Sequence, residues 1–352
     1  MTSFEKPSNS AADNASKTNG QRITGMGAAL VDLFADVSDD TLAALGSAKA
    51  SMALIDAAQS DAMQAEVSVH TQRPGGSAAN SIAGMAALGV ATGFVGKTGD
   101  DALGQVFADD FARLNVAFPQ NANHADGAAD RLPTGHCLVL VTPDAERTMH
   151  TVLGAAVTTA PDDLDADLLS DTALFFAEGY IWDSPTAKQA FLQAAEKVRG
   201  QGGKVAFSLA DGFCVERHHA DFMALLDSHI DIVLANEAEI TALFGSDDPQ
   251  NIAPLFAQHN LLGAVTYGAD GAYVFDGDEM AHVAAQKIDD IVDLTGAGDQ
   301  FAAGFLAALH SGKSPEKAAA TGIIAASEVI RHFGPRPQTD VAAQLAAAGL
   351  AL

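Results

Sequence analysis

The chain has 352 residues, 48% of them hydrophobic, which is enough for the core of one large α/β domain or of two ordinary domains. Its 45 acidic and 19 basic side chains give a formal net charge of −26. This charge argues against nucleic acid or an anionic membrane as a partner, whereas small anions stay open because they need only a local positive potential. Solubility or a salty habitat accounts for the overall acidity.

The cysteines and the polar start of the chain favour the cell interior. Cys137 and Cys214 lie far apart and outside any CxxC pair, so we expect a reducing compartment without disulfides or a zinc site. Residues 1–21 are polar and rich in Ser, Asn and Ala, which predicts a flexible tail rather than a signal peptide. No apolar run reaches the ~18 residues of a membrane span. We therefore expect a cytoplasmic protein.

From Arg22 onward, short apolar runs alternate with helical patterns. The runs that predict buried strands are "ATGFVG" (91–96), "ALFFAEG" (173–179), "KVAFSLA" (204–210), "DIVLANE" (231–237) and "LGAVTYG" (262–268). Repeated strand–helix units predict an α/β fold, a doubly wound, mainly parallel sheet flanked by helices, over residues 22–340, with a helical end over 341–352. Ligands of such sheets bind beyond the carboxyl ends of the strands.

Two regions break this rhythm. Residues 30–73 contain "LVDLFADV" and "AEVSVHTQ", which alternate like half-exposed strands, and residues 135–152 indicate a hairpin with "PDAE" as its turn. Alternating strands that interrupt a doubly wound domain predict a small β-sheet set apart from the main body, with a lid over the active site as its natural role. An edge extension of the main sheet is the alternative.

Two stretches imitate nucleotide-binding loops. "ATGFVGKT" (91–98) fits the loose phosphate-loop pattern, but its middle residues favour a strand and two aspartates follow shortly after it. "GMGAALVD" (25–32) hints at a dinucleotide loop, but it lacks the third glycine and the helical run that must follow. We interpret neither stretch as a nucleotide site.

The stretch "DLTGAGDQFAAGFLAALHSGK" (293–313) combines a turn of small residues with an acid. Its apolar spacing predicts a helix that begins near Ala297 or Gly298, whose first-turn N–H groups lack helical partners and carry the positive end of the dipole. Gly296, Ala297 and Gly298 let a ligand approach these amides, which predicts an anion hole. Asp299 lies beside it. Such an acid is often only a dipole partner, but here it can take a proton from an alcohol while the amides stabilise a phosphoryl group.

Taken together, the motifs resemble the ribokinase-like sugar and nucleoside kinases, the PfkB family, over residues 22–338. "DLTGAGDQFAAGF" resembles the carboxy-terminal signature of the family, and "RPGGSAANSIAGMAALG" (73–89) resembles the amino-terminal one. Shorter matches follow in the same order as in the family: "GKTGDDALG" (96–104), "ANEAE" (235–239) and "TYGADG" (266–271). The resemblance implies a ribokinase-like fold and an ATP-dependent phosphotransferase with an alcohol group as acceptor. It places Asp299 as the catalytic base.

On the substrate side, the resemblance implies that Asp32, Gly75, Gly76 and Asn80 bind the sugar. The chemistry of these residues agrees, because a glycine pair lets hydroxyls approach backbone amides and Asn80 offers both a donor and an acceptor. Asp32 can accept two hydroxyls at once, and an exposed strand acid is its alternative interpretation.

On the nucleotide side, Thr266, Gly268 and Gly271 match the ATP-binding loop of the family. Asn236 and Glu239 match its Asn-x-x-Glu element, which is associated with Mg²⁺ and would hold the ion through water. ATP with Mg²⁺ is therefore the expected cofactor set.

The resemblance does not decide whether the chain binds K⁺. Asp293 and Thr295 match part of the site at which some relatives hold this ion. The stretch "RHFGPRPQ" (331–338) departs from those relatives, because it carries two prolines where they often have smaller residues.

Two more stretches bear on the identity of the phosphate acceptor. Residues 133–156 and 178–185 resemble the bacterial adenosine-kinase-like branch of the family. Adenosine is therefore the expected acceptor, and ribose, fructose or a related sugar is the alternative. Trp182 follows a predicted strand and is a candidate to stack on a substrate base, whereas packing against the lid or a helix is its other interpretation.

Two other classes of protein were weighed. A non-catalytic binding protein on the same fold is a remoter alternative, which the intact Gly-Ala-Gly-Asp sequence disfavours. A nicotinamide-dependent enzyme would rest on residues 25–32 alone. We expect a monomer or homodimer that binds ATP and a small-molecule substrate.

Overall fold

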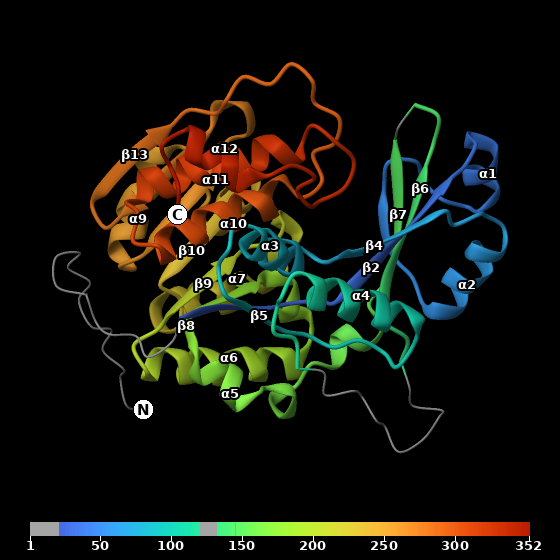
Figure 1. Cartoon of the computed structure of the whole chain (residues 1–352), viewed down its shortest axis with the longest axis horizontal. Helices are drawn as coiled ribbons and strands as arrows, with labels where there is room; N and C mark the ends of the chain where they lie inside the picture. The colour runs from blue at the N-terminus through green and yellow to red at the C-terminus, as the bar shows by residue number, and fades with distance from the viewer. Residues whose placement is uncertain (1–20, 120–131, 145) are drawn as a thin grey trace.

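The computed structural model describes residues 21–119, 132–144 and 146–352. The predicted tail, apart from Gln21, lies outside the described residues, and so does residue 145 in the predicted "PDAE" turn. A large sheet with helices on both faces forms the main body, and a smaller sheet stands beside it (Figure 1). The predicted α/β fold is therefore confirmed.

The large sheet has, in the part of the chain that is described, eight strands in the order β13-β12-β11-β10-β9-β8-β1-β5. Neighbours from β11 to β5 run parallel, and β12 and β13 form an antiparallel edge. The strands are β1 (Arg22–Met26), β5 (Thr92–Val95), β8 (Thr172–Glu178), β9 (Lys204–Ser208), β10 (Ile232–Asn236), β11 (Leu262–Thr266), β12 (Ala272–Asp276) and β13 (Glu279–Val283). Every predicted buried strand lies in this sheet. Strand β8 is buried at each position because helices cover both faces, which explains its continuous apolar run.

Two separate apolar cores lie on the two faces of the large sheet. Neighbouring residues of one strand point to opposite faces, so Phe175 packs into one core and Phe176 into the other. The core that holds Phe176 includes residues of α3 (Ser77–Ala87), α4 (Ala102–Arg113), α10 (Ala297–His310) and α11 (Pro315–Val329). The core that holds Phe175 includes residues of α5 (Ala166–Ser170), α6 (Pro185–Gly200), α7 (Gly212–Ser228), α8 (Glu237–Phe244) and α9 (Pro249–Gln258).

The remaining helical elements are short. Helix α12 (Val341–Ala347) packs on α11 and is the helical end that the sequence predicts. The 3₁₀ turns are η2 (Gly154–Thr158), η3 (Pro161–Asp163), η4 (Gly179–Asp183) and η5 (Gly268–Asp270). Among the described residues, no helix is long and apolar enough to cross a membrane.

The smaller sheet comes from the two regions that break the strand–helix rhythm. Its order is β3-β7-β6-β2-β4, and α1 (Asp39–Ala44) and α2 (Ala57–Ala65) lie beside it (Figure 1). The strands are β2 (Leu30–Asp36), β3 (Met52–Leu54), β4 (Thr71–Gly75), β6 (Gly135–Val141) and β7 (Arg147–Val152). The sheet is separate from the main one, as predicted, and is no edge extension of it.

One strand prediction in this region is wrong in its bounds. A strand was expected over "AEVSVHTQ", but α2 extends to Ala65 and β4 begins only at Thr71. A capping box of Asp56 and Gln59 starts α2, and the helix takes Ala65 alone from the expected strand. Residues 66–70 connect α2 to β4 and lie outside the pairing of β4 with β2, so their alternation reflects no strand. The two stretches that imitate nucleotide-binding loops in the sequence do not form such loops. Gly93 lies within β5, and "GMGAALVD" runs from β1 into β2 with no helix after it.

The phenylalanine cluster between β5 and α4 provides a test of the packing. The rings of Phe94, Phe107, Phe111 and Phe118 lie with centroids 4.6–6.0 Å apart. Because Phe107 is fully buried, Phe107→Ala should lower the free energy of unfolding by ~3–5 kcal/mol in urea titrations. Phe213→Ala is the control, because this side chain is 76% exposed and should change stability by less than ~0.5 kcal/mol. Equal losses in the two variants would contradict this packing.

Candidate active site

The anion hole predicted at the start of α10 has the required backbone. Helix α10 begins at Ala297, and its N-cap is Gly296 with φ 80°. A Cβ on Gly296 would lie 2.5 Å from Cα of Pro335, so only glycine fits there. Gly298 faces open space, which leaves its surroundings free for a ligand. The first-turn amides of the helix are therefore accessible to an anion.

Asp299 lies where the N-termini of α10 and α3 meet. Its carboxylate accepts hydrogen bonds from Ser77 Oγ at 2.7 Å and from Asn80 Nδ2 at 2.9 Å. Burial raises the pKa of Asp299 to about 6, against these two hydrogen bonds and the charge of Arg336. The group is therefore mostly ionised at neutral pH, and a base with this pKa can accept a proton efficiently.

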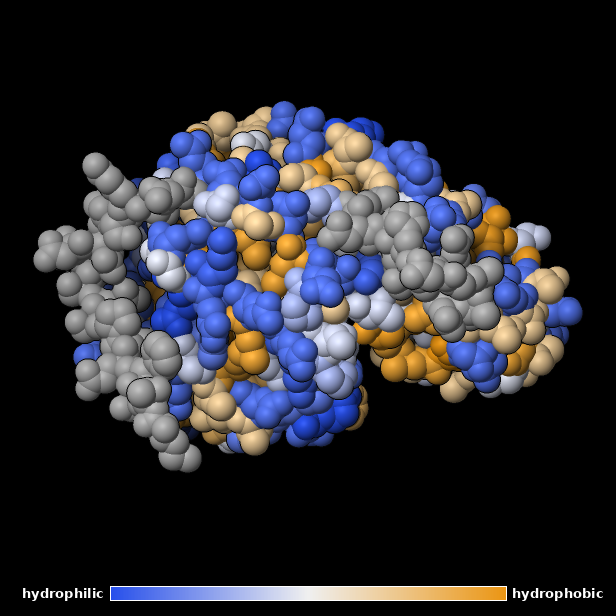
Figure 2. All heavy atoms as spheres, turned by 90° about the horizontal axis from the view of Figure 1, so that it is seen from below, coloured by the Kyte–Doolittle hydropathy of each residue, from blue (hydrophilic) through white to orange (hydrophobic). Residues whose placement is uncertain are grey.

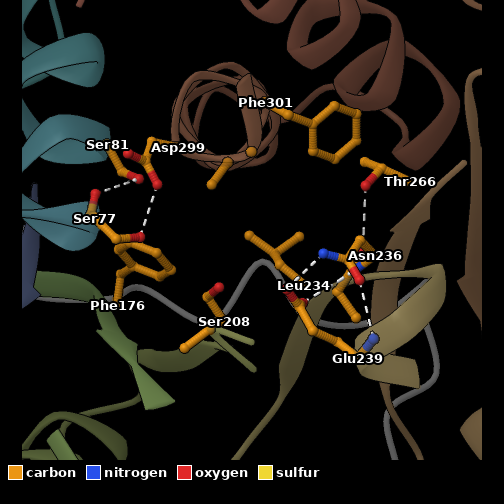
Figure 3. Close-up of a pocket in the computed structure, with 14 residues that line it drawn as sticks. Ser77, Ser81, Phe176, Ser208, Leu234, Asn236, Glu239, Thr266, Asp299 and Phe301 are labelled. Carbon is orange, nitrogen blue, oxygen red and sulfur yellow. Dashed lines mark hydrogen bonds between the residues drawn. The ribbon is translucent and has the colours of Figure 1, made fainter. Parts of the chain in front are cut away.

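Asn236 and Glu239 lie across a cavity of about 180 Å³ from Asp299 (Figure 3). They form the capping box of α8, with Glu239 N donating to Asn236 Oδ1 at 2.9 Å and Asn236 N donating to Glu239 Oε2 at 3.0 Å. Burial raises the pKa of Glu239 to about 7. No cluster of three or more His, Cys, Asp or Glu side chains that could hold a metal occurs in the described residues. The pair thus fits Mg²⁺ that is held through water and phosphate, rather than a cage made of protein ligands.

A larger cavity of about 570 Å³ begins at Ala297 and Gly298 and extends away from Asp299. Thr266, Gly268 and Gly271, which the sequence predicts to bind ATP, line it together with mostly apolar residues of the segment before α10 and of α11. Gly271 has φ 97°, which explains the need for glycine at this turn. A flat apolar group attached to phosphates could enter here with its phosphates at the helix N-terminus.

Asp32 and the glycine pair lie together on the other side of Asp299. Asp32 is opposite Arg73 in the pairing of β2 with β4, and a Cβ on Gly75 would lie 2.7 Å from Asp32 Oδ2. Gly76, with φ 94°, is the N-cap of α3. Burial raises the pKa of Asp32 to about 7, an effect that Arg336 opposes and the nearby Asp299 enhances. The expected sugar-binding residues are thus close to the expected base.

Trp182 requires a correction. The residue is only 3% exposed, its ring contacts Phe191, Phe207 and Phe222 edge to face, and its Nε1 donates to Asp221 at 2.9 Å. These contacts surround the ring in the core between the large sheet and its helices. The packing interpretation is therefore favoured over stacking on a substrate base.

Asp293 and Thr295 are held by an arginine of the smaller sheet. Arg147, at the start of β7, forms an ion pair with Asp293 and donates to Thr295 Oγ1 at 2.7 Å. Burial alone would raise the pKa of Asp293, but hydrogen bonds from Arg147, Gly334 and Thr295 hold it below its usual value. A cation already neutralises this carboxylate, so the arrangement does not fit an additional K⁺ ion.

Sequence reasoning missed several residues of the site. Glu178 ends β8, is 1% exposed and accepts hydrogen bonds from the amides of Ala28 and Ala78. An acid at the end of a continuous apolar run was a readable signal for it. Arg147 is the first residue of β7 and Arg336 lies in the loop between α11 and α12, and neither position carries such a signal.

Figure 2 shows a notch on the molecular surface between the main body and the smaller sheet, with hydrophobic residues exposed beside it.

Comparison with known proteins gives consistent matches. Residues 39–341 match the model of the pfkB family carbohydrate kinases. A probable sugar kinase protein from Rhizobium etli CFN 42 is similar in structure, with a TM-score of 0.84 and 36% identity, over 94% of this chain and 98% of that one. The adenosine kinase from Sinorhizobium meliloti has a TM-score of 0.83 and 36% identity, over 93% of this chain and 99% of that one. A ribokinase from Arabidopsis thaliana is 29% identical over 75% of this chain and 68% of its own length.

The ion pair of Arg147 leads to a test by thermal unfolding. In the native protein, KCl and NaCl at equal concentration should shift Tm equally, because the guanidinium already neutralises Asp293. Arg147→Met should leave a buried carboxylate without its cation and should therefore gain stabilisation that is specific to K⁺. Arg113→Met is the control, because this side chain is exposed and far along α4. A K⁺-specific shift in the native protein would show that the ion binds despite Arg147.

Proposed function

We propose that this chain, which belongs to the pfkB family of carbohydrate kinases, transfers the γ-phosphate of ATP to the primary hydroxyl of adenosine. Membership of the family makes it a phosphotransferase that acts on a hydroxyl of a sugar or a nucleoside. The choice of adenosine is supported by the nearly full-length similarity to the S. meliloti adenosine kinase. The similarity to the R. etli probable sugar kinase and to the A. thaliana ribokinase supports a sugar as the second candidate acceptor.

The observation that carries the proposal is the position of Asp299 between the N-terminus of α10 with its cavities and the carboxylate of Asp32. On one side lie the anion hole and the large apolar cavity, which suit a nucleotide with its phosphates at the start of α10. On the other side lie Asp32 and the Gly75–Gly76 pair, which suit a diol. A hydroxyl placed between these sides lies within reach of both the base and the phosphoryl group.

In the reaction, Asp299 takes the proton of the acceptor hydroxyl as the new O–P bond forms and the bond to ADP breaks. The amides at the start of α10 stabilise the charge on the phosphoryl oxygens. Ser77 and Asn80 hold the Asp299 carboxylate in place. Mg²⁺, when bound, neutralises the phosphates, and Asn236 and Glu239 are positioned to hold its water shell.

The smaller sheet is proposed to act as a lid. Two of its arginines contact loops of the main body. Arg147 bonds Asp293 and Thr295, and Arg73 Nη1 donates to Phe333 O at 2.8 Å. If the smaller sheet moves as a lid, these contacts would have to break when it opens.

The catalytic proposal is tested with Asp299→Asn. Loss of a general base should lower kcat by ~10²–10⁴-fold. Thermal stability should be retained, because the amide removes a buried charge whose pKa is raised in the fold. In the native enzyme, kcat/KM should decrease as pH falls through about 6, because protonation removes the base. Glu316→Gln, an acid in the first turn of α11, is the control for a simple dipole partner and should keep full activity. Near-native turnover in Asp299→Asn would refute the mechanism.

The acceptor is tested by comparing adenosine, 2′-deoxyadenosine and ribose. Hydrogen bonds to a charged group are worth about 1.5–3 kcal/mol, so loss of the 2′-hydroxyl should lower kcat/KM at least ~10-fold. We expect adenosine to be best and ribose poorest. Asp32→Ala should narrow the gap between adenosine and its 2′-deoxy form, whereas Asp36→Ala, an exposed acid on the same strand, should leave it unchanged. A higher kcat/KM for ribose or fructose than for adenosine would select the sugar-kinase alternative.

A further inference from the structure

Arg336 contacts Asn80, which in turn bonds Asp299, and it has no direct role in the proposed reaction. It is in the loop between α11 and α12, and its side chain is 17% exposed. The guanidinium forms an ion pair with Asp110 of α4 and lies 5.8 Å from the centroid of the Phe111 ring. Its Nε donates to Asn80 Oδ1 at 3.2 Å. Asp110 of helix α4 therefore holds the guanidinium of Arg336 against Asn80, the residue that bonds Asp299.

The contacts of Asn80 fix which way its amide points. An arginine can only donate hydrogen bonds and an ionised carboxylate can only accept them. With Arg336 on one side, the Asn80 oxygen must face it, and the Asn80 nitrogen must then face Asp299 Oδ2, to which it donates at 2.9 Å. A reversed amide would place its N–H groups against the guanidinium and its oxygen against the carboxylate. Both contacts would then be repulsive.

The loop that carries Arg336 is tied to the same place by independent contacts. Gln300, the residue after Asp299, donates from Nε2 to Pro335 O at 2.9 Å and to Asn80 O at 3.1 Å. Pro335 also packs on Gly296. The backbone around Arg336, the start of α10 and the first turns of α3 therefore form one connected unit.

The charges around Asp299 give Arg336 a second effect. Three other acids interact electrostatically with Asp299: Asp32 on β2, Glu178 on β8 and Glu239 on α8. Arg336 is the cation that favours the ionised form of Asp299, and it also acts on Asp32. Without it, the base would lie among like charges with only neutral hydrogen-bond donors to support its ionisation.

We propose that Arg336 is a positioning residue, which orients Asn80 through Nε, places a positive charge near the carboxylate of Asp299, and depends on Asp110 for its own position. The proposal rests on the proposed function in that Asp299 is taken as the base. The geometry that it uses, from Asp110 through Arg336 and Asn80 to Asp299, does not depend on which acceptor is phosphorylated.

Three variants separate the orienting effect from the effect of charge. In Arg336→Gln both are lost, so kcat at neutral pH should fall by roughly 10- to 100-fold and the acid limb of the kcat/KM profile should move to higher pH. In Arg336→Lys the charge remains but the planar donor to Asn80 does not, so kcat should fall while the acid limb stays near its native position. Arg113→Gln is the matched control, because Arg113 also bonds Asp110, at 2.7 Å, but is exposed and should give the native profile.

A measurement without turnover keeps this test apart from the proposed function. A ¹³C NMR titration of the Asp299 carboxyl, assigned by its loss in Asp299→Asn, should show a higher pKa in Arg336→Gln than in the native protein and in Arg113→Gln. An acid limb or carboxyl titration unchanged in Arg336→Gln, or identical behaviour of the Gln and Lys variants, would overturn the proposal. If Arg336→Gln fails to fold, Asp110→Asn tests the orienting role alone, because it removes the anchor of the guanidinium but keeps its charge. In this variant kcat should fall, and the carboxyl of Asp299 should not titrate at higher pH than in the native protein. Absence of kinase activity in the native protein, with the NMR shift present, would instead refute only the proposed function.

Discussion

The structure depends on two helix N-termini that meet around one carboxylate. The N-caps of helices α3 and α10 are Gly76 and Gly296, and both have a positive φ. Only glycine fits at these positions, because a side chain at either one would collide with neighbouring backbone. Asp299 at the start of α10 is bonded by Ser77 and Asn80 at the start of α3. Gly298 faces open space beside this meeting point and lines both cavities. A change in the distance between the two helix ends would alter the proposed base, the proposed anion hole and the proposed sugar-binding residues together.

A protein with a formal charge of −26 gathers Asp32, Glu178 and Asp299 around this point, where burial raises the pKa of each. Such a group of acids is stable only with compensating partners. Backbone amides of Ala28 and Ala78 supply them for Glu178. Arg73, Arg147 and Arg336 supply positive charge near Asp32, and all three come from the smaller sheet or from the loop after α11. These positive charges are therefore placed locally, whatever the net charge of the chain.

The smaller sheet contributes to the site in two ways. Strand β2 carries Asp32, and β7 carries Arg147, which bonds residues just before the anion hole. Because these strands belong to a sheet outside the main body, both layers of the molecule contribute residues to the proposed acceptor side and to the proposed phosphate side (Figure 1). A site shared between two layers suits an enzyme that must admit two substrates and then exclude water, as the proposed lid would do.

The sequence alone determined the features that rest on neighbouring residues. Apolar runs and their spacing predicted the strands of the large sheet, the separate smaller sheet and the start of α10, and local motifs located Asp299, Asn80, Asn236 and Glu239. The bounds of β4 were missed, because residues 66–70 alternate like a strand but only connect α2 to β4, outside its pairing with β2. Only the tertiary structure decided which distant side chains meet: Trp182 is in the core, Arg147 bonds Asp293, and Arg336 bonds Asn80, 256 positions away in the chain. Periodicity reports which face of an element is buried, whereas the partner of a single polar side chain depends on how the layers pack, and no local pattern encodes that.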